Sequence, residues 1–91
     1  MIRVQESADN IVIGASAERP GLSFTKINTY VPPTWPTGAR PQFLHLDARV
    51  VDLDKATQRA LELGAELLPG GGDNFNVLAD PIGHPFCLVE F

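Results

Sequence analysis

A proline-rich run in the middle of the chain, VPPTWPTGARP at 31–41, most constrains the fold, since it holds four prolines and a glycine. Proline lacks the backbone N–H that helices and sheet ladders use, so this run excludes a helix and a central strand. The regular structure must therefore lie on either side of it. We expect residues 31–41 to form an extended connector between residues 1–30 and 42–91.

The stretch after the connector predicts a βαβββ order. QFLHLDARV, at 42–50, alternates with a period of two, as a half-buried strand does. Asp52 suits a helix N-cap, the apolar residues that follow recur at helical spacing, and Gly64 suits a C-terminal stop, which together predict a helix over 53–64. Further strands are expected in ELLP, FNVLA and PFCLVEF, at 66–69, 75–79 and 85–91.

The stretch before the connector predicts three short strands and no helix. IRVQ alternates, a turn follows at Asp9-Asn10, IVIGASA gives a second strand, and Pro20-Gly21 leads into a third, LSFTKIN. The predicted fold class is therefore α+β, with βββ followed by one βαβββ module and one main helix.

Composition excludes several classes of partner. A net charge of −4 without a basic stripe argues against nucleic acid and against an anionic membrane surface. No apolar run approaches the roughly 20 residues that a membrane-spanning helix needs. Cys87 is the single cysteine, so an intrachain disulfide is impossible and a reducing cytoplasm is the expected location.

Two stretches, HLDARVVDLDKATQRALELGAELL at 45–68 and ADPIGHPFCLVEF at 79–91, resemble the glyoxalase-like domains of the vicinal oxygen chelate superfamily. That superfamily also holds bleomycin-resistance proteins and extradiol dioxygenases. The resemblance implies a curved mixed sheet whose concave face holds the ligand. It also implies that residues 1–91 form a single domain, in which 1–30 are a partial first module, 31–41 the connector and 42–91 a complete module. Compared with that family, the first module is expected to lack its opening strand and helix, either because the start codon is misplaced or because the natural protein has a shortened first module.

The resemblance also implies where a metal would bind. Metal-using relatives take one ligand from the first strand of a module, here His45, and a carboxylate from the last strand, at the position of Cys87. Glu90 and His84 differ from Cys87 in strand parity and are expected to face away. Residues 19–46 contain no Asp or Glu, so a single chain is expected to lack the three or four ligands of a metal site. We therefore expect no metal cofactor.

The strand at 42–50 offers a ligand-binding face instead. Asp47 and Arg49 lie on the face of His45, although a structural ion pair between them would explain both. Trp35 is either a lid over the ligand or a plug over the core, and its place between prolines favours the plug. Cys87 suits a buried small hydrophobe better than a nucleophile. The candidate ligand-binding residues are Trp35, Phe43, His45, Asp47, Arg49 and Cys87.

Two classes of function remain. The first is a metal-free protein that binds an apolar or aromatic small molecule in a concave pocket, as bleomycin-resistance proteins do. The second is a metal-dependent lyase or dioxygenase of the same superfamily, with a site assembled across a dimer. The missing carboxylates favour the first class, but a fold does not decide chemistry, so no catalytic residue is assigned.

A homodimer is the expected assembly. The leading three strands have no helix of their own, so Ile11, Ile13 and Phe24 risk exposure to water. A second copy would cover them, either by simple packing or by exchange of strands, and both chains would then line a pocket near His45.

Overall fold

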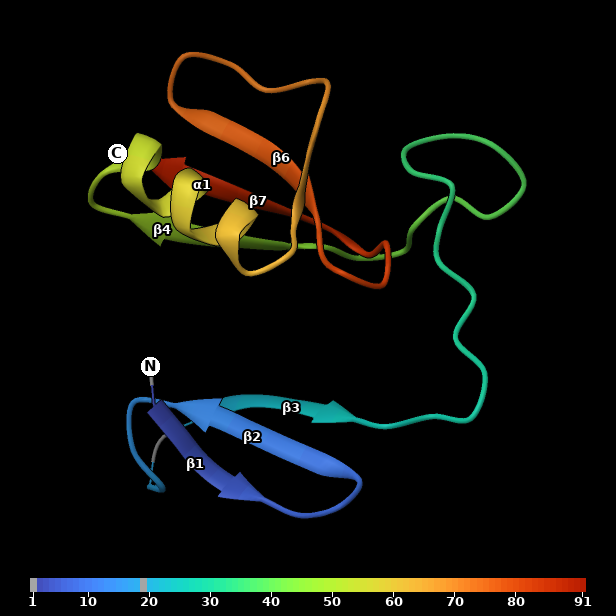
Figure 1. Ribbon diagram of the computed structural model, residues 1–91, viewed down its shortest axis with the longest axis vertical. Coiled ribbons are helices and arrows are strands. Elements are labelled where there is room, and N and C mark those ends of the chain that lie inside the picture. Colours follow the sequence, from blue (N-terminus) through green and yellow to red (C-terminus); the bar gives the residue numbers. More distant parts are fainter. Residues whose placement is uncertain (1, 19) are drawn as a thin grey trace. The chain divides into compact units, whose positions relative to one another are not determined.

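The computed structural model describes residues 2–18 and 20–91, and its chain forms two compact units, Met1–Val31 and Pro32–Phe91. Each unit has its own sheet (Figure 1). The boundary between the units falls at the start of the proline-rich segment. Met1 and Arg19 lie outside the described residues.

The first unit is an antiparallel sheet with the strand order β1-β2-β3. The pairing of β2 with β3 places Ile11 opposite Phe24 and Ile13 opposite Leu22 on one face, which we call the apolar face of the first unit. The strands are β1 (Ile2–Glu6), β2 (Asn10–Gly14) and β3 (Gly21–Thr25).

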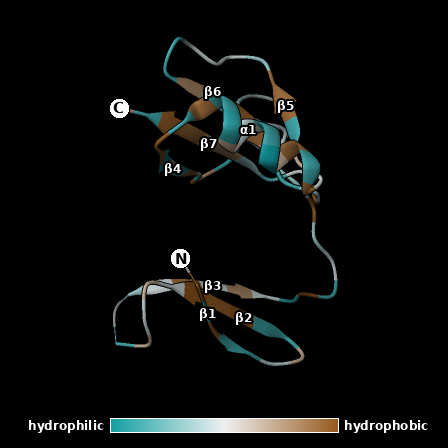
Figure 2. Ribbon diagram, turned by 60° about the vertical axis from the view of Figure 1, so that its left-hand side comes forward, coloured by the Kyte–Doolittle hydropathy of each residue, from teal (hydrophilic) through white to brown (hydrophobic). Residues whose placement is uncertain are grey.

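The opposite face of this sheet, which we call its polar face, carries Asn10, Ser23 and Thr25 together with Val12. Asn10 Oδ1 accepts hydrogen bonds from Ser23 Oγ at 2.7 Å and from Thr25 Oγ1 at 2.9 Å. The polar face thus has hydrogen bonds of its own, whereas the other face presents the aliphatic and aromatic side chains of β2 and β3 beside the Arg3–Glu6 ion pair of β1. Figure 2 colours most of β2 as hydrophobic.

The second unit has the predicted βαβββ order, and the α+β fold class is confirmed. Its sheet has the order β4-β7-β6-β5 and is mixed, because β4 runs parallel to β7 while the other neighbours are antiparallel. The elements are β4 (Leu46–Val50), α1 (Leu53–Glu62), β5 (Glu66–Leu68), β6 (Phe75–Ala79) and β7 (Pro85–Glu90).

The predicted start of the helix and both predicted capping residues are confirmed, although its last helical residue is Glu62 and not residue 64. The Asp52 side chain caps the first turn by accepting from the Lys55 backbone N–H at 3.1 Å. Gly64 follows the last turn with φ +105°, and the Ala65 N–H bonds back to the Ala60 carbonyl at 3.0 Å, as in a Schellman motif. The helix is 10 residues long, and the described part of the chain contains no helix long and apolar enough to cross a membrane.

The helix packs on one face of the four-stranded sheet and leaves the other face for the site (Figure 1). Leu53 of α1 packs against Leu78 of β6 and Leu88 of β7, and Leu78 has no exposed surface. Because strand side chains alternate, the neighbours Val77 and Cys87 point to the opposite face. The amphipathic colouring of α1 in Figure 2, with a teal outer side, agrees with this packing.

Several local predictions need correction. The second and third strands end at Gly14 and Thr25, three residues earlier than predicted, where their pairing ends. The strand expected at 42–50 begins only at Leu46, because its partner β7 begins at Pro85 and the paired register starts at Leu46 and Phe86. The connector is free of helix and strand, as expected, but it is not extended throughout. A loop closes where the Thr34 N–H donates to the Arg40 carbonyl at 2.7 Å.

Candidate functional site

An open pocket of about 540 Å³ lies on the face of the four-stranded sheet away from α1. All of its lining residues belong to the unit Pro32–Phe91. The apolar part of the lining comprises Trp35, Phe75, Val77 and Val89. This volume falls within the range of roughly 300–1,000 Å³ that is usual for small-molecule sites.

Strand register brings the polar lining together. β4 and β7 pair in parallel with Asp47 opposite Cys87, so these two side chains lie side by side on the pocket face. β6 then places Val77 on the other side of Cys87. His45 lies one residue before β4 and reaches the same place.

Asp47 is the centre of a small polar cluster. Its Oδ1 lies 3.2 Å from His45 Nε2, and its carboxylate also accepts a hydrogen bond from the Cys87 thiol. On the other side of the imidazole, Gln42 Nε2 lies 3.1 Å from His45 Nδ1. With the amide nitrogen of Gln42 as the donor, Nδ1 accepts and the ring hydrogen lies on Nε2, where it points to Asp47. His45, Asp47 and Cys87 thus form one polar cluster centred on the Asp47 carboxylate.

The thiol of Cys87 is held in its protonated form. Burial raises its pKa above the ordinary value of 9.0, and the negative charge of Asp47 and the hydrogen bond to it raise this pKa further. A thiol is nucleophilic as the thiolate. Cys87, with 6% of its surface exposed, therefore resembles the buried small hydrophobe that the sequence predicts rather than a nucleophile.

Replacing Asp47 by Asn should make Cys87 react faster with iodoacetamide. The change removes the carboxylate charge and so lowers the pKa of the thiol, whereas burial, the largest cause of the shift, stays in place. We expect an increase of roughly three- to tenfold near neutral pH, since one pKa unit changes the thiolate fraction tenfold. Mass spectrometry of the alkylated protein measures the rate. An unchanged rate in Asp47→Asn, with an unchanged rate in the helix variant Asp54→Asn, would contradict the described contact.

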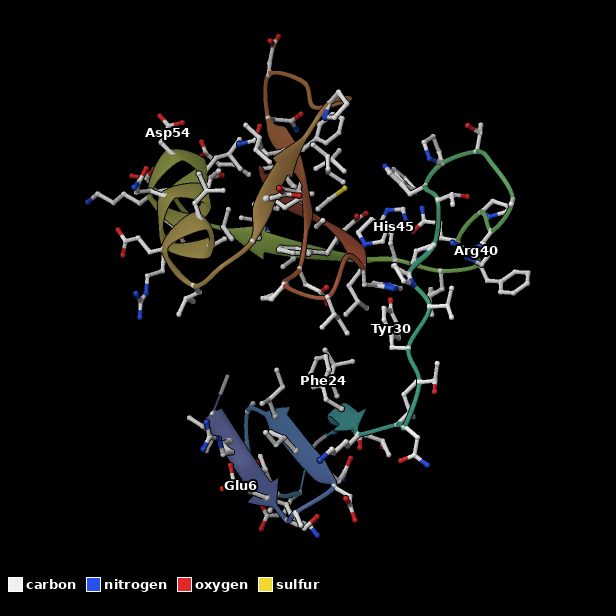
Figure 3. All side chains as sticks on the ribbon, turned by 45° about the vertical axis from the view of Figure 1, so that its right-hand side comes forward. Glu6, Phe24, Tyr30, Arg40, His45 and Asp54 are labelled. Carbon is white, nitrogen blue, oxygen red and sulfur yellow. The ribbon has the colours of Figure 1, made fainter. Side chains whose placement is uncertain are left out.

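Trp35 belongs to the pocket and not to the helix-facing core. Its ring meets the His45 imidazole edge to face, with centroids 5.2 Å apart and an interplanar angle of 69°. The loop that carries it is closed by Thr34, whose hydroxyl accepts from the Arg40 N–H at 2.9 Å. Figure 3 shows His45 next to this loop, where the chain leads into β4. Of the two roles considered for Trp35, this position is that of a pocket wall or lid.

Two of the six candidate ligand-binding residues lie outside the pocket. Phe43 precedes β4 and is fully exposed, because the strand that was to hold it starts only at Leu46. Arg49 does not pair with Asp47. Its Nε and Nη2 donate to the Phe91 main-chain oxygen at 3.1 and 2.8 Å, and its guanidinium lies 4.4 Å from the Phe91 ring centroid.

The last strand divides its reactive side chains as strand parity predicts. Cys87 faces the pocket, whereas Glu90 faces the helix, where its Oε2 accepts from the Leu53 N–H at 2.6 Å. Glu90 therefore completes the capping of α1. His84 lies before β7, where its backbone N–H donates to Asp80 Oδ1 at 2.8 Å, and it is not part of the pocket lining. His84, Cys87 and Glu90 therefore do not form one site.

Sequence reasoning missed the pocket wall provided by β6. Phe75 and Val77 pair in register with Val89 and Cys87, so all four side chains share one face. Both FNVLA and PFCLVEF alternate, and pairing these two strands across the Asp80–Gly83 turn would have assigned their pocket-facing residues. The alternation of both strands is visible in the sequence, but assigning their pocket-facing residues requires the register between the two strands.

The sequence predicts that a single chain lacks the three or four ligands of a metal site, but the structure brings three potential donors together. His45, Asp47 and Cys87 each provide one donor atom, and these atoms lie within 4.8 Å of one another. Nitrogen, oxygen and sulfur donors in this number suit a zinc-like ion with one open position. Asp47 was not counted as a donor because a structural ion pair with Arg49 would have explained both residues.

Comparison with known proteins places the chain in a family. The family of glyoxalase-like domains matches residues 3–89, which covers almost the whole chain. This match fits the vicinal oxygen chelate superfamily indicated by the sequence motifs. A search of curated proteins found no match. The chain therefore belongs to the glyoxalase-like domain family.

Proposed function

We propose that the protein binds an organic small molecule, without a metal ion, in the pocket beside Asp47. The observation that carries this proposal is the pocket itself, about 540 Å³ in volume, with an apolar floor and a polar cluster at one place. Pockets that bind small molecules combine a mostly apolar lining with a few polar groups that fix orientation. Phe75 and Trp35 would contact an aromatic or alkyl part of the ligand, and Asp47 would orient its polar end.

The hydrogen bonds of His45 support the metal-free form. A histidine that binds a metal through Nε2 usually donates its Nδ1–H to an oxygen. Here Gln42 presents its amide nitrogen to Nδ1, so Nε2 carries the hydrogen that points to Asp47. In this state both ring nitrogens of His45 have protein partners, and no cation is needed to satisfy them.

Filling the pocket should abolish most of the binding. In Val89→Phe, the added ring atoms would occupy space that the ligand needs, because Val89 lines the pocket. We expect at least about a tenfold loss of affinity, equivalent to about 1.4 kcal/mol. Small aromatic compounds can be titrated against the fluorescence of Trp35, the single tryptophan, which lies in the pocket wall.

The matched control is Val51→Phe, since Val51 is 98% exposed and outside the pocket. This variant should bind with unchanged affinity. Equal affinity of Val89→Phe and the unsubstituted protein would show that the ligand binds elsewhere.

A metal-dependent enzyme, a lyase or dioxygenase, is the second candidate. It is favoured by the three donors within 4.8 Å and by Gln42 Oε1, a buried oxygen without a hydrogen-bond partner in the described structure. Turning the Gln42 amide over would direct this oxygen to His45 Nδ1, which is the orientation that a metal at Nε2 requires. His45, Asp47 and Cys87 would then hold the ion, which would supply Lewis-acid chemistry.

Titration with metal ions separates the two candidates. If the protein acts without a metal, calorimetry with Zn²⁺, Ni²⁺, Mn²⁺ and Co²⁺ should give only weak heats, with dissociation constants above about 0.1 mM. Co²⁺ should also give no intense thiolate charge-transfer absorption. Tight stoichiometric binding with this absorption, lost in His45→Ala and in Cys87→Ser, would establish the metal centre instead.

A further inference from the structure

Asp47 is the one carboxylate among the described residues that line the pocket, and no lysine or arginine is among them. Its side chain is 61% exposed, so water solvates the charge while the pocket is empty. A ligand that covers Asp47 removes part of this water. Unless the ligand provides a donor or a positive charge, this desolvation costs binding free energy.

The nearest cation of the same strand does not neutralise Asp47. Arg49 follows two residues later and shares its side of β4 by alternation. Its guanidinium donates two hydrogen bonds to the Phe91 main-chain oxygen and stacks on the Phe91 ring. The described contacts of Asp47 are with His45 and Cys87, and both donate hydrogen bonds to its carboxylate.

The aromatic walls add to the same preference. Trp35 and Phe75 line the pocket together with Asp47, and the faces of aromatic rings attract cations. Asp47 lies beside Cys87 in the paired strands and lines the pocket itself, so its charge acts directly on a bound ligand. An organic anion would meet the carboxylate with no lysine or arginine among the described lining residues to compensate for the repulsion.

We propose that the natural ligand is a small organic cation, in which an amine or a quaternary ammonium group is joined to an aromatic or branched alkyl group. The positive group lies at Asp47 and beside the aromatic walls, and the apolar group lies on Phe75, Val77 and Val89. This inference rests on the proposed function, since it names the class of ligand for the same pocket.

Three probes of similar size but different charge test the inference: 2-phenylethylamine, 2-phenylethanol and 3-phenylpropionate. Trp35 fluorescence and calorimetry at low ionic strength report their affinities, since salt would screen a half-exposed charge. The amine should bind at least about fivefold more tightly than the alcohol, because an exposed ion pair and a cation–π contact each contribute modestly to the binding free energy. The carboxylate should bind more weakly than the alcohol.

Asp47→Asn is the decisive variant, because it keeps the shape of the side chain and removes the charge. The advantage of the amine over the alcohol should disappear in Asp47→Asn. It should persist in Asp54→Asn, whose substituted residue is exposed on α1 and outside the pocket. Circular dichroism verifies that both variants are folded.

The outcomes distinguish the two levels of the proposal. If the alcohol or the carboxylate binds as tightly as the amine, the pocket binds small molecules but the cation inference is wrong. An amine advantage that persists in Asp47→Asn also overturns the inference. If none of the three probes binds, the proposed function and the inference fail together.

Discussion

Replacing Leu78 with alanine should lower the free energy of unfolding by about 2–5 kcal/mol. Leu78 lies at the centre of the second unit, has 0% of its surface exposed and packs between Leu53 of α1 and Leu88 of β7. The substitution removes this apolar contact and leaves a cavity beneath the helix. A domain of this size has a total stability of only about 3–9 kcal/mol, so much of the protein should unfold.

Leu67→Ala is the matched control. Leu67 pairs directly with Leu78 across β5 and β6, but it is 56% exposed. The same chemical change should therefore cost about 1 kcal/mol or less. Chemical denaturation followed by circular dichroism measures both variants. Equal losses from the two substitutions would show that the core does not centre on Leu78.

The order of elements in the second unit could be predicted because its signals are local. Asp52 and Gly64 mark the two ends of the helix through contacts within a few residues. The alternation in FNVLA and PFCLVEF likewise shows in each strand alone. The start of β4 could not be predicted in this way. It depends on where β7 begins, about 40 residues further along the chain. The alternation in QFLHL starts at residue 42, before the first residue of β4 that pairs with β7.

The residues of the candidate site could be predicted better than the contacts among them, since Asp47 and Trp35 were also candidates and line the pocket. The family resemblance indicated His45 and Cys87, and both lie in the pocket. Asp47 became the third member because the parallel register sets it beside Cys87 and leaves Arg49 to contact Phe91. Trp35 reached the pocket through the loop closed by Thr34 and Arg40. Each of these facts depends on contacts between segments that are distant in sequence or held by a specific loop.

The apolar face of the first unit is the basis for the proposal that the protein is a homodimer. Phe24 is 53% exposed and projects from this sheet (Figure 3), with Ile11 beside it on β2. The polar face is satisfied by its own hydrogen bonds, whereas the apolar face gains about 1.5–3 kcal/mol for each large side chain that becomes fully buried. An isologous two-fold contact is the commonest way for a small protein to obtain such cover.

Sedimentation at micromolar concentration should therefore give about twice the chain mass of 9.9 kDa. Phe24→Asp should weaken the dimer at least about tenfold, because an isologous interface contains the change twice and each half-buried ring contributes about 1 kcal/mol. Thr25→Asp, on the polar face of the same strand, should leave the mass unchanged or nearly so. A folded monomer at these concentrations would show that no second copy covers Phe24. Equal weakening by Thr25→Asp would place the contact on another surface, since only one of the two residues lies on the apolar face.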